Sequence, residues 1–161
     1  MCKAIRFKLP GNGILQINGD VIKELSMFKQ IESESTEAGG VILGRILKET
    51  NHLIIDEITT PFKSDIRKRF YFKRRKESHQ KIVDKRWKES DKTENYFGEW
   101  HTHAEDNPTP SYVDKDDWKR RVKRDKLFLD FLVSIIVGRE SIEVWLTDEN
   151  EKIIKLKKAN V

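Results

Sequence analysis

The sequence contains a single cysteine, Cys2, which lies at its amino terminus. One cysteine cannot form a disulfide framework within the chain, and it cannot complete a cysteine-rich zinc site alone. Long hydrophobic runs are also missing, since Met1 to Asn12 has no apolar stretch of the signal-peptide kind. The most apolar segment, Leu127 to Val137, contains Asp130 and is too short to span a bilayer. We therefore expect a cytoplasmic protein without a membrane partner.

Apolar residues are scarce, at 37% of the chain, and charged residues make up another 37%. A length of 161 residues fits one domain, and the low apolar fraction predicts that its core is small. The 32 basic and 27 acidic residues leave a formal net charge of +5. That excess fits an acidic protein partner or weak nucleic-acid contact and does not choose between them. Since repeats, linkers and low-complexity tails are absent from the sequence, we expect residues 1–161 to form a single domain.

The order of apolar segments predicts a mixed α/β (α+β) fold in which helices pack on a sheet. Strands are expected where apolar residues alternate or run together between turn residues. The expected strands are 3–9, 14–17, 37–47, 53–59, 96–102, 129–137, 141–146 and 153–156, with a short strand or loop anchor at 70–72. Apolar residues at helical spacing predict helices over about 21–31, from about 77 onward, and over 111–126.

A strongly basic stretch, Arg67 to Lys88, carries three consecutive aromatic residues, Phe70 to Phe72, near its start. Aromatic rings among cations are typical of single-stranded nucleic-acid binding, so a basic nucleic-acid-binding module is one interpretation. A solvated charged surface is the simpler interpretation, and docking of an acidic partner or substrate protein also fits. His52 and His79, in a turn and in the basic stretch, are expected to be solvated.

Two histidines one residue apart, His101 and His103, lie at the end of an expected strand. Alternation in an extended chain points both imidazoles to the same side. A loop with two prolines follows, and then Ser111-x-x-Asp114, a sequence typical of a helix cap. Two imidazoles and one carboxylate form a ligand set that zinc uses in hydrolases, with a fourth position left for water. This spacing predicts a zinc site made by His101, His103 and Asp114.

A zinc hydrolase also needs a base, and two glutamates are candidates. Glu37 directly precedes Ala38 and the pair Gly39-Gly40, which permits close approach of a neighbouring backbone. Glu99 is a rival, because alternation puts it on the same face of the expected strand as the two histidines. The local pattern leaves Glu99 open as a base or as a fourth ligand.

One composite pattern consists of Glu37-x-x-Gly40 with Leu43 and Gly44, followed by His101-x-His103-x7-Ser111-x-x-Asp114. It resembles the motif of the JAMM (MPN-plus, JAB-domain) zinc metalloproteases, and the resemblance covers most of the chain. It implies a curved mixed sheet packed with helices, of cytidine-deaminase-like architecture. It also implies a role for each of these residues. Glu37 would be the general base, His101, His103 and Asp114 the zinc ligands, and Ser111 the residue that stabilises the tetrahedral intermediate. Ala104 departs from the family, where proline is common, and this change affects loop rigidity rather than a ligand.

The form Gly98-Glu99-Trp100-His101-Thr102-His103 also resembles a bacterial branch of this family. Its members accompany ubiquitin-activating and ubiquitin-conjugating-like enzymes in anti-phage (CBASS) or similar operons. The resemblance implies a zinc-dependent isopeptidase that cuts at the C-terminal tail of a ubiquitin-like conjugate, with a cGAS-like nucleotidyltransferase (CD-NTase) as the target. A non-catalytic MPN-type scaffold is the alternative from another class, and the complete five-residue set argues against it. Residues that bind the substrate are not assigned by any motif.

Overall fold

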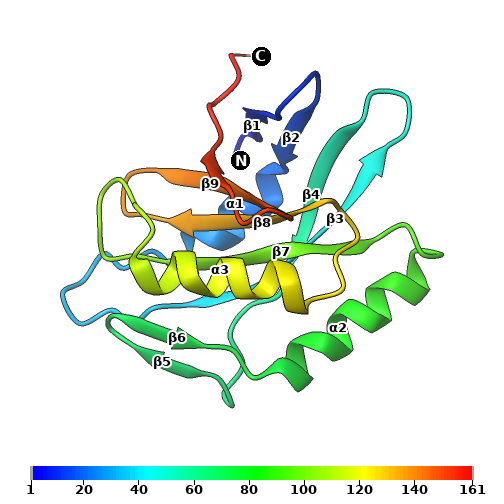
Figure 1. The fold of residues 1–161 in the computed structure, drawn as a ribbon. Helices are drawn as coiled ribbons and strands as arrows, with labels where there is room; N and C mark the ends of the chain where they lie inside the picture. Colours follow the sequence, from blue (N-terminus) through cyan, green and yellow to red (C-terminus); the bar gives the residue numbers. More distant parts are fainter. Residues whose placement is uncertain (1, 161) are drawn as a thin grey trace.

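Eight strands join edge to edge in the order β1-β2-β4-β3-β7-β8-β9-β10 (Figure 1). The computed structural model describes residues 2–160. Within these residues the strands of this sheet are β1 (Ile5–Lys8), β2 (Ile14–Ile17), β3 (Gly39–Leu47), β4 (His52–Ile58), β7 (Asn95–Thr102), β8 (Phe131–Val137), β9 (Ile142–Asp148) and β10 (Ile153–Lys155). A separate hairpin consists of β5 (Ile66–Lys68) and β6 (Tyr71–Lys73). The helices are α1 (Gly19–Ser26), α2 (Lys76–Glu89) and α3 (Tyr112–Arg124).

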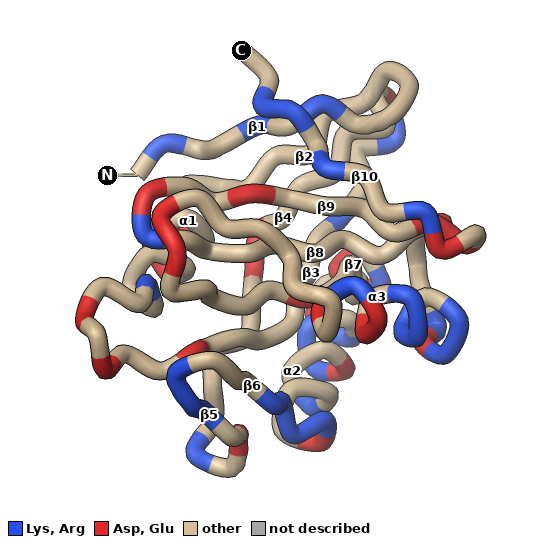
Figure 2. The backbone as a smooth tube through the Cα atoms, turned by 60° about the vertical axis from the view of Figure 1, so that its left-hand side comes forward, with Lys and Arg blue, Asp and Glu red and all other residues tan. Residues whose placement is uncertain are grey.

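The sheet is both mixed and curved. β2 pairs with β4, and β7 with β8, in parallel, whereas the other neighbours are antiparallel. The two outer strands approach each other, because Phe7 in β1 forms an antiparallel bridge with Lys158, just after β10. The Lys8 N–H donates to the carbonyl of Lys157 at 2.8 Å. β1 and the segment after β10 therefore lie side by side (Figure 2), and the predicted curved mixed sheet with helices is confirmed.

Apolar side chains fill both faces of the central strands. In β8, Val133 and Ile135 pack into the larger core together with residues of α1, whereas Leu132 faces the other side. There it joins a smaller cluster with Trp118 of α3 and Trp145 of β9, whose ring centroids are 5.9 Å apart. This cluster fixes α3 against β8 and β9, so the start of α3 has a defined place relative to the sheet.

The strands agree with the predicted ones within a few residues, except that β5 was not predicted, and two helices differ in extent or in their buried face. α1 ends at Ser26 instead of near residue 31, and Ile31 is 60% exposed. α2 covers the expected residues, but its buried residue is His79, and Trp87 of the predicted apolar stripe is 39% exposed. None of the helices in residues 2–160 has the length and apolar character needed to cross a membrane.

The glycine pair at the start of β3 allows two neighbouring backbones to approach closely. A Cβ atom at Gly40 would lie 2.1 Å from the carbonyl oxygen of Thr59. A Cβ atom at Gly39 would lie 2.7 Å from both the carbonyl oxygen of Trp100 and a ring carbon of Phe72. A side chain at Gly40 would push Thr59 away from β3, and one at Gly39 would push away β7 and the β5–β6 hairpin. The predicted role of this glycine pair is confirmed.

Candidate metal centre

β7 presents His101 on the face of the sheet that α3 covers. Its neighbour Trp100 points into the larger core on the other face, where its indole N–H donates to the carbonyl of Thr59 at 2.8 Å. His103 follows the end of β7, and its N–H donates to the carbonyl of Val137 at 3.0 Å. The ring centroids of the two histidines are 4.8 Å apart, so both imidazoles lie on the same side, as predicted.

Asp114 comes from the first turn of α3 and contacts both histidines. Its Oδ1 atom is 3.2 Å from Nε2 of His101, and its Oδ2 atom is 3.1 Å from Nε2 of His103. The two Nε2 atoms are 3.1 Å apart. The structure therefore brings together the three side chains for which zinc ligation is predicted, and their ligand atoms all lie within 4.8 Å of one another.

The separations among these atoms fit a tetrahedral zinc ion. Zinc binds imidazole nitrogen and carboxylate oxygen at about 2.0–2.1 Å, so two ligands of a tetrahedral ion lie about 3.3 Å apart. The observed distances of 3.1, 3.1 and 3.2 Å are close to that length. Two neutral imidazoles and a carboxylate also form a donor set that zinc prefers. The geometry and the chemistry of the three side chains are thus suited to this metal.

Ser111 and Asp114 form a capping box at the start of α3. The Asp114 N–H donates to Oγ of Ser111 at 3.1 Å, and the Ser111 N–H donates to Oδ2 of Asp114 at 2.9 Å. Burial raises the pKa of Asp114, but hydrogen bonds with His101 and His103 outweigh burial and hold this pKa well below its ordinary value. The helix start therefore fixes the position of an ionised carboxylate.

Glu105 contacts the ring nitrogen of His103 that faces away from Asp114. Its Oε1 atom is 2.8 Å from Nδ1 of His103. An Nδ1–H group that donates to this carboxylate leaves the lone pair of Nε2 free for a metal. Burial lowers the pKa of His103, but hydrogen bonds with Asp114 and Glu105 outweigh burial and raise it. Glu105 is not among the predicted site residues, although its position two residues after His103 would have pointed to it.

Glu37, two residues before β3, lies on the side that faces His101, His103 and Asp114, as their electrostatic effect on its carboxyl group shows. Gly39 pairs with His101, and the Thr102 N–H donates to the carbonyl of Ala38 at 3.0 Å. Continuation of this antiparallel register places Glu37 opposite His103, and residues directly opposite in an antiparallel pair share one face. The β3–β7 pairing thus brings together residues that are far apart in the sequence.

The β5–β6 hairpin holds the segment that carries Glu37. The Glu37 N–H donates to the carbonyl of Lys68 at 2.7 Å, and Nε of Arg67 donates to the carbonyl of Glu37 at 2.9 Å. Burial raises the pKa of the Glu37 carboxyl group to about 7, while His101 and His103 lower it and Asp114 raises it. A carboxyl group with a pKa near 7 is suited to accept and return a proton at neutral pH.

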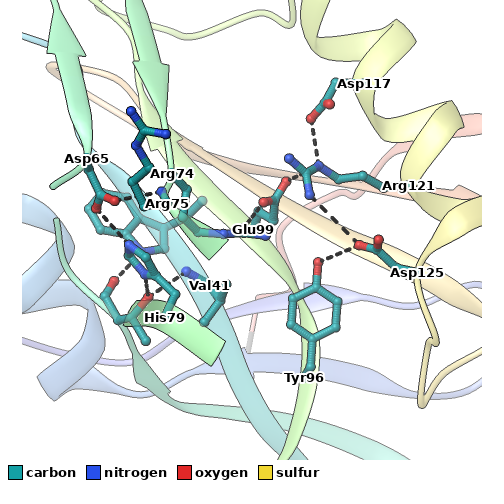
Figure 3. Close-up of polar contacts among 12 residues, drawn as sticks. Val41, Asp65, Arg74, Arg75, His79, Tyr96, Glu99, Asp117, Arg121 and Asp125 are labelled. Carbon is teal, nitrogen blue, oxygen red and sulfur yellow. Dashed lines mark hydrogen bonds and ion pairs between the residues drawn. The ribbon is translucent and has the colours of Figure 1, made fainter. Parts of the chain in front are cut away.

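Glu99, the rival candidate, is engaged by two arginines (Figure 3). Arg74, directly after β6, forms an ion pair with its Oε1 atom, and Nε of Arg121 in α3 lies 2.7 Å from its Oε2 atom. Arg121 also pairs with Asp117 at 2.7 Å and with Asp125 at 3.9 Å. Both carboxylate oxygens of Glu99 therefore bind cations of the protein, which disfavours it as a base or a fourth ligand.

His79 is buried rather than solvated as expected, with 1% of the residue exposed. Its Nδ1 atom is 2.6 Å from Oγ1 of Thr59, and its Nε2 atom is 2.7 Å from Oδ2 of Asp65 (Figure 3). Oγ1 of Thr59 in turn accepts a hydrogen bond from the N–H of Val41 in β3 at 2.8 Å. Backbone N–H groups of Phe62 and Arg75 donate to the Asp65 carboxylate. This network ties α2 to the strand that follows Glu37.

Comparison with known proteins places these features in a family. A family model described as prokaryotic homologs of the JAB domain matches residues 25–148. A protein of Vibrio cholerae serotype O1 named CD-NTase/cGAS isopeptidase is 34% identical over 148 residues, which cover 92% of this chain and 90% of that protein. Proteins of the same name from Pseudomonas aeruginosa and Escherichia coli are 35% and 34% identical, and the matches cover 83% and 90% of this chain and 82% and 88% of those proteins.

The fold also occurs in a solved structure. The solution structure of protein DSY2949 from Desulfitobacterium hafniense matches with a TM-score of 0.61 and 15% sequence identity. The match covers 86% of this chain and 87% of that one. At this identity the likeness concerns the fold alone.

Proposed function

The chain belongs to the family of prokaryotic homologs of the JAB domain, and on this premise we propose that it is a zinc-dependent isopeptidase of the JAMM type. The observation that carries the proposal is the convergence of His101, His103 and Asp114 at distances suited to zinc, with Glu37 aligned beside them by the β3–β7 register. The isopeptidase names of three relatives at 34–35% identity support the reaction class.

In this proposal zinc is held by Nε2 of His101, Nε2 of His103 and the carboxylate of Asp114. When bound, zinc supplies Lewis acidity, which lowers the pKa of water and polarises a carbonyl group. The chain contributes rigid placement of its three ligands, two of them beside the central β8 strand and one in a capped helix start.

Glu37 is the proposed general base. Its carboxylate accepts a proton from the attacking water and returns it to the leaving nitrogen of the peptide or isopeptide bond. In the metal-free chain, burial raises the pKa of Glu37 to about 7, which makes its carboxylate a stronger base than an ordinary glutamate and supports proton acceptance. The hydrogen bonds to Lys68 and Arg67 keep the backbone of Glu37 in place during this exchange.

Ser111 is the proposed donor to the carbonyl oxygen of the substrate. Its Oγ atom already accepts a hydrogen bond from the Asp114 N–H, so its own hydroxyl proton is free to donate elsewhere. Donation to an oxygen that gains negative charge in the transition state stabilises that state more than the ground state.

We further propose that the substrate is a conjugate in which a ubiquitin-like or CD-NTase-type protein is joined through its C-terminal tail, within bacterial anti-phage (CBASS) defence in the cytoplasm. The names of the relatives support a CD-NTase/cGAS-type target. Ubiquitin-activating and ubiquitin-conjugating-like enzymes of the same operon are the partners that such a role implies.

The nucleic-acid-binding alternative is less well supported. The basic stretch runs through β5, β6 and α2 (Figure 2), and several of its arginines already have partners in the protein. Arg74 is paired with Glu99, Arg86 is paired with Glu57 at 2.6 Å, and Arg67 donates to backbone carbonyls. Cations that already bind carboxylates or carbonyl groups of the protein are less available to phosphates. The scaffold alternative gives no reason for three metal-binding side chains to converge.

The proposal is tested with a fusion in which the C-terminal tail of a CD-NTase is joined to a reporter protein. The purified chain with zinc should release the reporter, and a chelator should stop the release until zinc is restored. Cleavage that continues in a chain shown to be free of metal would contradict zinc dependence. A zinc-loaded chain that cleaves neither this fusion nor one with a ubiquitin-like tail would contradict the isopeptidase function.

A further inference from the structure

A cavity lies on the face of the sheet that α3 covers, between this helix and the last two strands, β9 and β10. Its volume is about 570 Å³, within the usual range for ligand sites. The loop residues Thr109 and Pro110 form one end, Lys115 and Lys119 of α3 form one wall, and Trp145 and Lys155 of β9 and β10 form another. We call this site the lysine cavity.

The lysine cavity is positively charged. Within residues 2–160, none of Lys115, Lys119 and Lys155 forms an ion pair with a carboxylate. The acidic residue of the lining, Glu151, is engaged by Lys123 at 3.1 Å. The ammonium group of Lys155 lies 5.9 Å from the ring centroid of Trp145. Three cations without acidic partners around one cavity favour the binding of a negatively charged ligand.

The lysine cavity is connected to the metal centre through one side chain. Both the backbone N–H and the hydroxyl of Thr109 lie 3.4 Å from the carboxylate of Glu105, within hydrogen-bond distance. The same carboxylate contacts Nδ1 of His103 at 2.8 Å. Pro110, which also lines the cavity, directly precedes Ser111. A substrate polypeptide whose scissile bond lies at the metal centre could therefore reach the lysine cavity with its neighbouring residues.

The spacing of the lysines matches an extended acidic chain. Lys115 and Lys119 are four residues apart on one helix face, which separates their Cβ atoms by about 6 Å. Carboxylates at alternate positions of an extended peptide are about 7 Å apart. The described lining contains no arginine and no glycine-rich loop, the features that commonly hold phosphate groups by paired donors. Flexible lysines suit separate carboxylates better than one compact phosphate.

We propose that the lysine cavity binds an acidic segment of the polypeptide substrate, close to the bond that is cleaved at the metal centre. This inference rests on the proposed function for the identity of the ligand, while binding at the cavity itself needs no catalysis. The cavity would select conjugates by the charge of the sequence that flanks the scissile bond.

Binding is tested on the full chain with a fluorescein-labelled peptide of alternating glutamate and alanine, measured by anisotropy at low salt. The glutamine counterpart of the peptide is the neutral control. Lys115→Glu combined with Lys119→Glu should raise the Kd of the acidic peptide by about tenfold or more, because attraction is replaced by repulsion at two positions. Lys155→Glu, on the opposite wall, should weaken binding in the same direction.

The matched control is Lys81→Glu combined with Lys88→Glu, which makes the same charge change at exposed positions of α2. It should leave the Kd nearly unchanged. Equal weakening by both double variants would show a general charge effect and would overturn the proposal, as would no weakening by either. Displacement of the peptide by inorganic phosphate or ATP at lower concentrations than by unlabelled acidic peptide would also overturn it.

Cleavage kinetics separate this inference from the proposed function. With a fusion substrate that carries glutamates beside the scissile bond, the Lys115/Lys119 double variant should show a higher KM and an unchanged kcat. With a neutral flank the variant should match the unmodified chain. If the double variant is active but its KM for the acidic substrate is not raised, the inference about the lysine cavity is overturned and the proposed function is not. If the unmodified chain binds the acidic peptide as described but cleaves no substrate, the proposed function is contradicted and the inference about binding is not.

Discussion

Glu105 and His103 form a carboxylate–imidazole pair at 2.8 Å, directed away from Asp114. Of the two ring nitrogens of His103, Nδ1 faces Glu105 and Nε2 faces His101 and Asp114. Such a pair fixes the tautomer and the orientation of a histidine that binds a metal, and it increases the basicity of the ligating nitrogen. Glu105 therefore belongs to the candidate metal centre, where it supports His103 and is not itself a predicted ligand.

Glu105→Ala is expected to weaken zinc binding by about 10–100-fold, the usual effect of removing such a partner. The dissociation constant is measured by competition with a fluorescent zinc chelator. Glu140→Ala, an exposed change in a neighbouring loop, is the control and should leave the constant unchanged. An equal zinc affinity in the Glu105 variant and the unmodified chain would show that the pair does not orient His103.

Glu37→Gln is expected to keep zinc and to lose turnover. The amide retains the shape of the side chain but cannot accept the proton, which should lower kcat by about 10²–10⁴-fold. Zinc content by elemental analysis and kcat on the fusion substrate are measured together. Glu34→Gln, an exposed glutamate three residues earlier, serves as control. Normal activity of Glu37→Gln would contradict the assignment of Glu37 as the general base.

Ser111 has two separable roles, in the cap of α3 and in the proposed reaction. Ser111→Ala should lower kcat by about 10²–10³-fold and should also cost about 1 kcal/mol of stability through loss of the cap. Ser111→Gly also removes the hydroxyl, but glycine is tolerated at a helix N-cap, so this variant should lose only a few tenths of a kcal/mol while kcat falls as far as in Ser111→Ala. If the glycine variant recovers kcat together with stability, the loss of activity came from the helix start and Ser111 is not a donor in the reaction.

Much of the site could be predicted because its residues are adjacent in sequence or joined by a recognisable motif. His101, His103 and Asp114 lie within one strand, loop and helix start, so local periodicity places them together. Glu37 is brought to them by the β3–β7 register, which no local pattern contains, and its proposed role came from the resemblance to a family.

Other features depend on long-range packing and were not predicted. His79 lies in a strongly basic helix, and only the folded chain places it between Thr59 and Asp65. Likewise, the two arginines that engage Glu99, Arg74 and Arg121, come from segments well before and well after it in the sequence. A buried polar network has no periodicity in the sequence, so burial must be known before it can be recognised.

Glu99→Gln is expected to destabilise the chain and to leave zinc binding intact. The carboxylate neutralises two arginines whose side chains are only 13% and 18% exposed, so its removal should cost on the order of 3 kcal/mol. Glu57→Gln is the matched control, because its pair with Arg86 is 33–38% exposed and should be worth less than about 1 kcal/mol. Urea unfolding gives both values. Loss of zinc in Glu99→Gln with unchanged stability would instead make Glu99 a ligand.

In the metal-free chain, the contribution of His79 to the free energy of unfolding should fall as the pH is lowered through the range in which free histidine gains a proton. Burial lowers the pKa of His79, although Asp65 opposes that effect by hydrogen bonding. The unfolded chain then binds a proton at a pH where folded His79 does not. The contribution of His79 is therefore fully present above the unfolded pKa of 6.5 and is lost as the pH falls toward the folded pKa.

Asp65 acts in the same direction at lower pH. Burial raises its pKa, but hydrogen bonds from the N–H groups of Arg75 and Phe62, and then from His79, outweigh burial and lower it. Its contribution is present above the ordinary carboxyl pKa of 3.8 and is lost only below it. Between about pH 5 and about pH 7.5 the Asp65 carboxylate therefore stays ionised, and His79 is the member of the pair that titrates.

The measurement is urea unfolding of the unmodified chain and of His79→Gln in a chelator, at several pH values across that range. Removing the buried hydrogen bonds should lower stability by about 1–3 kcal/mol at neutral pH. The difference between the two proteins should shrink as the pH falls, because glutamine has no proton to gain, and this subtraction cancels the titration of His101 and His103. The control is Gln80→Ala, at the next position of α2, which changes an exposed side chain that does not titrate. Its difference in unfolding free energy from the unmodified chain should not depend on pH. A constant difference for His79→Gln would mean that His79 titrates equally in the folded and unfolded chains.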